Sequence, residues 1–277
     1  MLEATLIISV YTNTIALKSV LDSVMNQSWK NFEILISEDG ESNQMKTFLS
    51  AYPFDLTWNH LTQEDLGWRK NRALNQAVRS AKSDYLVFID GDCVLHPRFM
   101  EMHHRYAKEG RILAGKRIKL NESLSERLSN GEITPTMVQH YLSKNIFSFK
   151  KKGFRFQEEG FFVDPDGFTG FIPNFRKMSQ LKGCNMSFSK KAIHAINGFD
   201  EDYIRPAIGE DIDLVWRFKR AGYGLFSLRN LAVQYHLHHT ENWTDQSENI
   251  RMMEEKQNAN LFYCVNGLEK NRSNQSE

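Results

Sequence analysis

The chain opens with short runs of aliphatic residues that are separated by amphipathic segments. Thr5–Val10 (TLIISV) and Phe32–Ser37 (FEILIS) are continuous apolar runs, and Tyr85–Ile89 (YLVFI) is a third. Uninterrupted runs of this kind are typical of strands that are buried on both faces of a parallel sheet. Leu56–His60 is a weaker run of the same type. We therefore expect each of these runs to form a strand.

The segments between these runs carry apolar residues at helical spacing. Leu17, Val20, Leu21 and Val24 form one stripe, and the segment Trp68–Ala81 carries another. This spacing places side chains on one face of an α-helix. Repeated strand–helix–strand units predict an α/β fold with a mostly parallel, doubly wound sheet that is flanked by helices.

The second half of the chain is less regular. Gly183–Phe188 (GCNMSF) resumes a strand-like pattern, Asp211–Ala221 predicts a helix, and Leu225–Gln234 predicts a short strand. From Glu241 onward the sequence is polar, and Lys270–Glu277 has the composition of a disordered terminus.

A segment rich in phenylalanine and lysine interrupts this second half. Nine phenylalanines fall between Phe147 and Phe175, and they are interleaved with Lys and Arg. Three interpretations stay open for this segment. It forms a loop or helical insertion that becomes ordered over bound ligands, a basic and aromatic surface that contacts anionic lipid, or a small subdomain that buries its aromatic side chains.

Composition excludes some classes of function. The 35 Lys and Arg residues nearly balance the 34 Asp and Glu residues, giving a net charge of +1, so nothing points to a nucleic-acid partner. The three cysteines are far apart in the sequence, which predicts free thiols. The N-terminus lacks the basic start and long apolar run of a signal peptide, and no stretch approaches the length of a membrane span. We expect a cytoplasmic protein.

Polar and acidic residues follow three of the predicted strands. They are Tyr11, Thr12 and Asn13 after the first, Glu38 and Asp39 after the second, and Asp90 to Asp92 after the third. In open parallel sheets, ligands bind outside the carboxyl ends of the strands. The sequence therefore predicts a ligand site at this edge.

Asp90-Gly91-Asp92 is the most informative of these groups. Two carboxylates separated by a glycine can both face one hard cation, which in turn can bridge the oxygens of a diphosphate. The competing interpretation is a solvated turn after a strand. The position of the motif, directly after an apolar strand at the expected ligand edge, favours the metal-binding interpretation.

Two further clusters lie in the second half. Glu210 and Asp211, with Asp213 behind them, precede a predicted helix, where acidic residues either cap the helix or serve as a general base. His236 and His239 belong to the sequence YHLHH, which offers imidazole ligands for a divalent cation. If the strand continues through this sequence, His236 and His238 point to the same side.

These residues together resemble the family-2 glycosyltransferases that have a GT-A fold. The matching segments are IISVYTNT, ILISEDG, LGWRKNRALNQAV, YLVFIDGDC, LKGCNMSFSK, INGFDE, GEDIDLVWRFKRAG and VQYHLHH. They cover most of residues 4–240 in the order that the family has. The resemblance implies an inverting transferase that depends on a divalent metal ion, Mn²⁺ or Mg²⁺, and takes a UDP-sugar donor.

The resemblance also assigns roles to individual residues. Tyr11 and Asp39 would hold the uracil and ribose, with Thr12 and Asn13 nearby. The remaining donor-binding positions would be Gly67, Arg69, Arg72, Asp90, Gly91, Asp92, Gly183 and Asn185, with Arg69 on the diphosphate. For Arg72, an exposed position on a surface helix is the alternative.

For the chemistry, the resemblance makes Asp211 the catalytic base and Glu210 a residue that holds the acceptor or the donor sugar. Asp92, Asp90, His236 and His239 would bind the metal ion, with His236 preferred over His239. The base would deprotonate an acceptor hydroxyl, which then displaces the nucleoside diphosphate in one step with inversion.

The same resemblance predicts the organisation of the chain. Residues 1–240 would form one catalytic domain, with a nucleotide-binding half over 1–115 and an acceptor-binding half over 116–240 that includes an acceptor-side insertion near 140–180. Residues 241–277 would be a helical, polar tail. The expected product is a hexosyl or N-acetylhexosaminyl linkage to a saccharide or lipid-linked acceptor in bacterial surface polysaccharide synthesis, with peripheral membrane contact as an option.

Two other classes of protein were weighed. A catalytically inactive scaffold that binds nucleotide sugars is the main alternative, although it has no need to keep Asp90, Asp92, Asp211 and His236 together. A nucleotidyltransferase would carry a glycine-rich, lysine-containing phosphate loop after the first strand. Here that segment reads SVYTNTIALKS, without a glycine.

Overall fold

The computed structural model describes residues 2–145, 153–240 and 244–270. Within them, a seven-stranded sheet has the order β3-β2-β1-β4-β8-β6-β9. Its strands are β1 Ala4–Val10, β2 Phe32–Glu38, β3 Trp58–Leu61, β4 Tyr85–Asp90, β6 Arg111–Ala114, β8 Met186–Ser189 and β9 Gly224–Ser227. A three-stranded sheet has the order β5-β10-β7 and consists of β5 Cys93–Leu95, β7 Ile118–Lys119 and β10 Gln234–His236.

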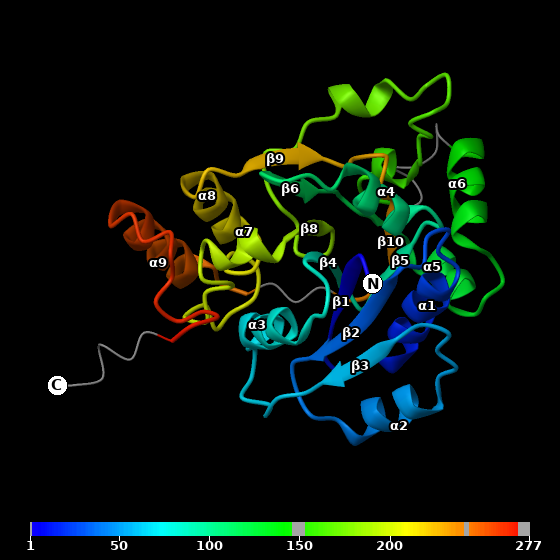
Figure 1. The fold of residues 1–277 in the computed structure, drawn as a ribbon. Helices are drawn as coiled ribbons and strands as arrows, with labels where there is room; N and C mark the ends of the chain where they lie inside the picture. Colours follow the sequence, from blue (N-terminus) through cyan, green and yellow to red (C-terminus); the bar gives the residue numbers. More distant parts are fainter. Residues whose placement is uncertain (1, 146–152, 241–243, 271–277) are drawn as a thin grey trace.

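Helices flank the large sheet on both sides (Figure 1). They are α1 Thr14–Met25, α2 Asn43–Ala51, α3 Lys70–Ser80, α4 Phe99–Tyr106, α5 Glu122–Ser129, α6 Pro135–Lys144, α7 Lys190–His194, α8 Ile212–Arg220 and α9 Ser247–Asn258. Two short 3₁₀ helices, η2 Gln157–Gly160 and η3 Ile172–Phe175, lie in the predicted insertion.

The pairing pattern confirms the predicted α/β class. Strand β1 pairs in parallel with both β2 and β4, and β2 pairs in parallel with β3. Strand β8 is antiparallel to β4 and to β6, while β6 and β9 are parallel. The first four strands are therefore the parallel unit that the sequence predicts, and their carboxyl ends share one edge.

Alternation along the central strands explains why their sequences are continuously apolar. In β1, Leu6 and Ile8 pack into the core that includes α1, whereas Ile7 packs into the core that includes α3. Successive side chains of a strand point to opposite faces. Because both faces of the sheet are covered by helices, most positions of these strands are buried and no polar alternation is needed.

The predicted strand Leu225–Gln234 is wrong as a single element. The structure divides it into β9, which ends at Ser227, and β10, which begins at Gln234 and belongs to the other sheet. Asn230 lies between them with a φ of 64°, and its side-chain amide donates to the carbonyls of Glu158 (2.7 Å) and Phe161 (2.8 Å). The apolar residues of this turn are buried without forming a strand, so the pattern alone was misleading.

The small sheet brings the histidine segment to the end of β4. In its register His236 pairs with Cys93, which directly follows the DGD sequence, and also with Lys119 of β7. Two segments more than a hundred residues apart in the chain thus meet at the edge where the parallel strands end.

The C-terminal segment packs back onto the body of the molecule. The Arg217 side chain of α8 donates to the carbonyl of Phe262 (3.0 Å), and the Asn197 amide donates to the carbonyl of Cys264 (2.7 Å). Helix α9 in this segment consists mostly of polar residues. The predicted disorder of Lys270–Glu277 falls almost entirely on 271–277, which lie outside the described residues.

Some phenylalanines of the phenylalanine-rich segment are buried and others are exposed. Phe154 is buried, and Phe161 and Phe162 pack against the core, whereas Phe168 and Phe175 are exposed. Residues 146–152 lie outside the described part, so the interpretation of Phe147 and its neighbours stays a prediction. None of the helices described here has the length and apolar character that crossing a membrane requires.

Candidate active site

A cleft of about 560 Å³ opens where β1, β2 and β4 end. Its lining includes eight of the residues that the sequence predicts for donor binding: Tyr11, Thr12, Asn13, Asp39, Gly67, Asp90, Gly91 and Asp92. His239, Trp68 and Lys70 also line it, with Ser9 and Ser37 among the other polar residues. The cleft is therefore built from strand ends and from the segment that leads into α3.

Gly91 shapes the turn between the two aspartates. Its backbone N–H donates to the carbonyl of Ser9 (2.8 Å) in the neighbouring strand. A Cβ atom at position 91 would lie 2.8 Å from Cγ1 of Val10 and 3.1 Å from the Ser9 carbonyl oxygen. Only glycine allows so close an approach, and the tight turn sends the carboxylates of Asp90 and Asp92 to different neighbours.

Asp92 meets the histidine segment. One of its carboxylate oxygens lies 3.3 Å from Nε2 of His236 and 3.3 Å from Nε2 of His239, and the two Nε2 atoms are 3.3 Å apart. Burial opposes the charged form of Asp92, but hydrogen bonds from both imidazoles hold its pKa well below the ordinary value. Both histidines named by the sequence thus converge on one carboxylate.

His238 does not share this position, contrary to the expectation that His236 and His238 point to the same side. Strand β10 ends at His236, so the strand alternation stops there. The backbone N–H of His238 donates to Ser125 Oγ (2.8 Å), and its side chain is exposed. The chain turns beyond the strand and brings His239 back instead.

The residues present fit a divalent cation. Asp92, His236 and His239 offer one carboxylate oxygen and two imidazole nitrogens that all lie within 4.8 Å of one another. Mixed oxygen and nitrogen ligands of this kind suit Mn²⁺ and related ions. The structure does not bring Asp90 into this group.

Asp90 instead lies between two cations. Lys70 Nζ is 2.8 Å from one of its oxygens, and an Arg117 nitrogen is 3.1 Å from the other. The same Lys70 ammonium is 3.0 Å from Glu210. Burial disfavours the Lys70 charge, yet the Asp90 and Glu210 carboxylates hold its pKa above the ordinary value.

Glu210 and Asp211 stand at the start of α8. Burial raises the pKa of the Glu210 carboxyl and also that of the Asp211 carboxyl, whose nearest cationic partner, Lys182 Nζ, is 3.9 Å away. A carboxylate with a raised pKa is a stronger base. Asp213, two residues on, is fully buried and paired with Arg217 at 3.0 Å, so it supports the fold.

Four predicted donor-binding residues do not line the cleft. Arg72 is exposed on α3, in agreement with the alternative of an exposed position on a surface helix. The Arg69 guanidinium donates to the adjacent carbonyl of Trp68 (2.8 Å), and its backbone N–H donates to Asp39 (2.8 Å). Gly183 lies against Glu210, where a Cβ atom would be 3.5 Å from the Glu210 carboxylate.

Asn185, the fourth, is fully buried behind the site. Its amide donates to the carbonyls of Lys116 and Ala232, both at 2.9 Å, and its oxygen contacts Nε2 of His103 at 3.1 Å. Burial lowers the pKa of His103 to about 3, so the imidazole is neutral at physiological pH. Asn185 therefore ties the loop that carries Gly183 to the segments of Lys116 and Ala232.

The end of the cleft beside β2 is lined by Tyr11 and Asp39. The Tyr11 hydroxyl donates to Asp65 (2.8 Å), which raises the pKa of the phenol. Asp39 accepts from the side chain of Gln63 (2.7 Å) and from the backbone of Arg69, so it fixes the path of the loop 63–69. An exposed aromatic ring above a carboxylate suits a base and its ribose.

Sequence reasoning missed two cations, Lys70 and Arg117. Lys70 lies in the segment LGWRKNRALN, from which only Arg69 was predicted to contact the diphosphate. Arg117 lies in no motif, and only the fold brings it to Asp90. Nothing in its local sequence could have identified it.

Comparison with known families identifies glycosyltransferases as relatives of this chain. Residues 5–178 match the family described as "Glycosyl transferase family 2", and residues 174–240 match "N-terminal domain of galactosyltransferase". The chain is 28% identical to the uncharacterized glycosyltransferase YfnE of Bacillus subtilis over 93% of this chain and 71% of that protein. It is 23% identical to a chondroitin synthase of Escherichia coli, with 93% of this chain matched to 38% of that much longer protein.

Solved structures share the fold. A mannosyltransferase of Pyrobaculum calidifontis, solved with GDP-Man and Mn²⁺, matches with a TM-score of 0.55 at 14% identity, over 92% of this chain and 61% of that chain. S. aureus TarS residues 1–349, solved with UDP-GlcNAc, matches with a TM-score of 0.55 at 13% identity, over 92% of this chain and 66% of that chain. At this identity the likeness concerns the GT-A architecture alone.

Proposed function

The chain belongs to glycosyltransferase family 2, and on that premise we propose that it transfers a hexose or N-acetylhexosamine from a UDP-sugar to a hydroxyl group, with inversion. The observation that carries this proposal is the cleft lined by Asp92, His239 and Lys70. His236 joins Asp92 and His239 in one group, and Glu210, the neighbour of Asp211 in the chain, contacts the Lys70 ammonium. A nucleotide pocket, a cation site and a base are the parts that a one-step glycosyl transfer requires.

The donor is proposed to lie along the cleft from Tyr11 to Asp92. The exposed ring of Tyr11 and the carboxylate of Asp39 would hold the base and ribose, because an aromatic face can stack on a base and a carboxylate accepts from ribose hydroxyls. The TarS complex with UDP-GlcNAc supports a uridine nucleotide, while the mannosyltransferase complex contains GDP-Man. The structure of the cleft is compatible with a nucleoside diphosphate, and the choice of uracil rests on the resemblance.

Charge on the departing diphosphate would be met by two features of the chain. A divalent cation held by Asp92, His236 and His239 would supply positive charge to the diphosphate oxygens. Lys70 lines the same cleft and is fixed by Asp90 and Glu210, so its ammonium is preorganised before the donor arrives.

Asp211 is proposed to remove the proton from the acceptor hydroxyl. Its carboxylate is largely buried at the start of α8, and its raised pKa makes it a better proton acceptor than an ordinary aspartate. Glu210 is bound to Lys70 and is therefore less free to take a proton. We assign Glu210 to holding the Lys70 ammonium and the sugar beside it.

The acceptor is proposed to be a saccharide or a lipid-linked saccharide of bacterial surface polysaccharide synthesis. The support is the likeness to a chondroitin synthase, of which this chain spans 38% of the length. A surface on η3 supports access to a lipid-linked acceptor: Phe168, Phe171 and Phe175 are 96%, 55% and 78% exposed, with Lys177 exposed beside them. Exposed aromatics next to cations suit a peripheral membrane contact.

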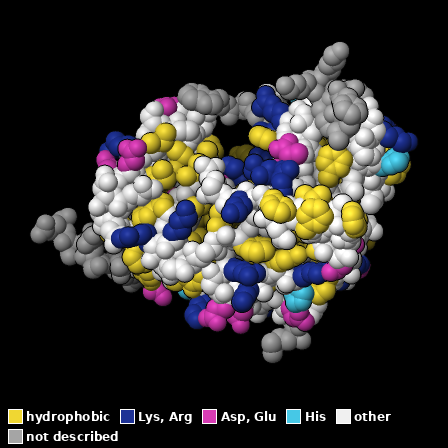
Figure 2. All heavy atoms as spheres, turned by 90° about the horizontal axis from the view of Figure 1, so that it is seen from above, with side chains coloured by type: hydrophobic (Ala, Val, Ile, Leu, Met, Phe, Trp, Pro, Cys, Tyr) yellow, Lys and Arg dark blue, Asp and Glu magenta, His cyan; other side chains and the backbone are white. Residues whose placement is uncertain are grey.

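The location of this surface is consistent with such a contact. The segment with η3 projects at the top of Figure 1, and the face seen from above in Figure 2 carries hydrophobic side chains interspersed with Lys and Arg. We define these residues, Phe168, Phe171, Phe175 and Lys177, as the η3 surface. It lies outside the lining of the donor cleft, so membrane contact would leave the cleft open.

The decisive experiment measures UDP binding and UDP release by the purified chain with a panel of UDP-sugars, with and without Mn²⁺. Release that depends on Mn²⁺ for one donor and is abolished in Asp92→Ala supports the proposal and identifies the sugar. Metal-dependent UDP binding without release, even with acceptor saccharides added, would favour the alternative of an inactive nucleotide-sugar scaffold. Absence of UDP binding would overturn the assignment of this cleft as a uridine-nucleotide site.

A further inference from the structure

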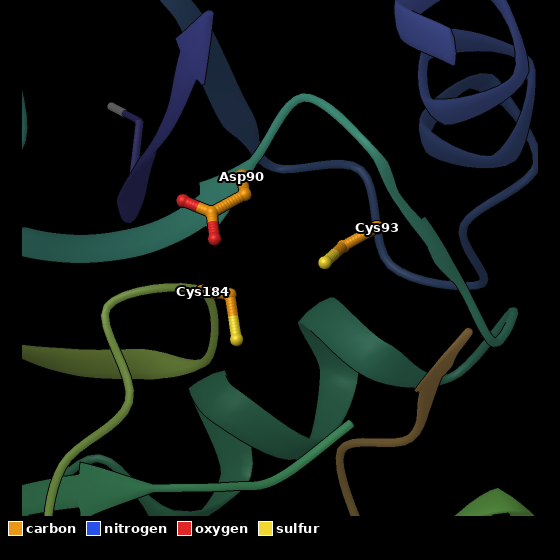
Figure 3. A group of neighbouring side chains, drawn as sticks. All are labelled: Asp90, Cys93 and Cys184. Atoms are coloured by element: carbon orange, nitrogen blue, oxygen red, sulfur yellow. The ribbon is translucent and has the colours of Figure 1, made fainter. Parts of the chain in front are cut away.

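Two of the three cysteines, far apart in the sequence, meet beside the DGD turn. Cys93 begins β5 directly after Asp92, and Cys184 lies in the loop that leads into β8. Their sulfurs and a carboxylate oxygen of Asp90 all lie within 4.8 Å of one another. Figure 3 shows Asp90 and Cys93 on either side of the DGD turn and Cys184 on a second segment, with the Cys93 sulfur pointing toward the other two side chains.

We propose that Asp90, Cys93 and Cys184 form a second metal site, which takes a thiophilic divalent cation such as Zn²⁺. It adjoins the Asp92–His236–His239 group, because the Cys93 thiol donates to Asp92 at 3.4 Å, but it has its own set of ligands. The donor types decide the preference. Thiolates suit Zn²⁺, Co²⁺ or Cd²⁺, whereas Mg²⁺ and Mn²⁺ prefer oxygen. Two sulfurs and one carboxylate oxygen leave a fourth position of a tetrahedron open.

Charge balance supports the same cation class. Lys70 and Arg117 already contact the two oxygens of Asp90, so an ion that simply added two positive charges here would be repelled. When Zn²⁺ binds two thiols, both S–H bonds break, two Zn–S bonds form and two protons leave to the buffer. The net charge of the cluster is then unchanged, and no electron is transferred, so no oxidant or reductant is needed.

The site has an entry path. Cys93 and Cys184 are 0% and 2% exposed, which protects the sulfurs from bulk solvent. The Asp90 side chain retains 23% exposure and lines the donor cleft, so an ion can approach from that side. A bound ion would also link two segments of the chain, because Cys184 lies between Gly183 and Asn185, whereas Cys93 directly follows the DGD turn.

The two metal groups use different chemistry, so one spectroscopic probe can separate them. Co²⁺ bound to thiolates gives an intense sulfur-to-cobalt charge-transfer band in the near ultraviolet, whereas Co²⁺ on a carboxylate and two imidazoles has no such band. We therefore titrate the full chain, under reducing conditions, with Co²⁺ and then displace Co²⁺ with Zn²⁺. The proposal does not depend on transferase activity.

The expected result is a charge-transfer band in the wild type that Zn²⁺ abolishes. The band should be lost in Cys93→Ser and in Cys184→Ser. The Zn²⁺ affinity of this site should fall by roughly 100-fold or more in each variant. Loss of a supporting residue already lowers metal affinity by roughly 10–100-fold, and loss of a ligand should lower it further. The band should persist in Asp92→Ala and in Cys264→Ser. Cys264 is as buried as the other two cysteines, but its thiol donates a hydrogen bond to the carbonyl of Asn197.

A wild-type measurement guards against variants that fail to fold. Zn²⁺ should slow alkylation of Cys93 and Cys184 by N-ethylmaleimide, read by mass spectrometry, and leave alkylation of Cys264 unchanged. A wild type without a charge-transfer band, a band that survives both serine substitutions, or equal protection of all three cysteines would each overturn the proposal.

Discussion

The Lys70 ammonium lies 2.8 Å from the Asp90 carboxylate, although the two residues come from different elements, the start of α3 and the end of β4. The same ammonium is 3.0 Å from Glu210 at the start of α8. One cation therefore joins the end of β4 to the carboxylate of Glu210 at the start of α8. Its removal would leave two largely buried acids without this partner.

Replacing Lys70 with methionine should reduce both stability and nucleotide binding. Breaking a buried ion pair by removing one partner costs about 3–5 kcal/mol, and the remaining contact of Asp90 with Arg117 should bring the loss below that range. Urea unfolding at neutral pH measures the stability, and UDP titration measures binding.

Because the cost arises from uncompensated carboxylates, it should shrink as the pH is lowered and they become protonated. Adding Glu210→Gln to Lys70→Met should recover part of the stability for the same reason. A Lys70→Met variant as stable as the wild type would contradict the role of this ion pair, and Arg72→Met on the exposed face of the same helix is the matched control.

Asp211→Asn should abolish transfer while leaving the fold intact. A positioned general base contributes roughly 10²–10⁴-fold to the rate, so kcat should fall by that order with UDP affinity little changed. Burial raises the pKa of Asp211, which means that the folded state disfavours its charge. Asn at this position should therefore be neutral or stabilising in thermal unfolding at neutral pH, whereas a lower melting temperature with normal activity would refute the assignment.

The transfer rate should fall on the acid side at a higher pH than an ordinary aspartate would give. The base must be deprotonated, its pKa is raised by burial, and activity is lost as the pH falls through that raised value. Lys182 lowers the pKa of Asp211 from 3.9 Å away. Lys182→Met should accordingly move the acid limb of kcat/KM to still higher pH, and Lys108→Met, at an exposed lysine remote in sequence from Asp211, should not.

His239→Ala should weaken Mn²⁺ binding and His238→Ala should not. The two residues are adjacent and both exposed, but only His239 brings its Nε2 atom to Asp92, at 3.3 Å. Loss of a supporting residue lowers metal affinity by roughly 10–100-fold, and loss of a ligand should lower the Mn²⁺ affinity by more than that. Mn²⁺ titration followed by electron paramagnetic resonance measures the difference, and equal affinities in the two variants would exclude His239 as a ligand.

Gly115→Ala should destabilise the protein through Asn185. A Cβ atom at position 115 would lie 2.3 Å from the Asn185 amide nitrogen, which donates to two buried carbonyls. Overpacking costs about 1–3 kcal/mol, and an unsatisfied buried polar group costs about as much. Gly224→Ala is the control, because its Cβ would find no atom closer than 3.9 Å. Chemical denaturation compares the two.

Phe168→Ser combined with Phe175→Ser should release the chain from anionic vesicles. Each exposed aromatic that inserts into an interface can contribute about 1.5–3 kcal/mol, so the pair should change binding by roughly 100-fold or more. Co-sedimentation with vesicles of phosphatidylserine and phosphatidylcholine measures this, and Ile250→Ser, an exposed apolar residue on α9, is the control. No binding by the wild type would remove the membrane contact from the proposed function.

The sequence alone determined the parallel half of the fold and one edge of the site. Thr5–Val10, Phe32–Ser37 and Tyr85–Ile89 were identified as strands because their apolar runs are local patterns that any buried parallel strand needs. Parallel strands end at one edge, so the sequence correctly predicts that Tyr11, Asp39, Asp90 and Asp92 line one cleft. The clusters that contain Asp211 and the histidines were also visible in the sequence, and the resemblance assigned their roles.

Tertiary structure alone decided which side chains meet. Asp90 contacts Lys70 and Arg117, whereas Asp92 contacts His236 and His239 rather than His238. Cys93 meets Cys184. Each of these contacts joins segments that are distant in sequence. Periodicity reports which face of an element is buried, but it carries no information on which distant segment packs there. That pairing follows from sheet order and register, which the whole chain settles together.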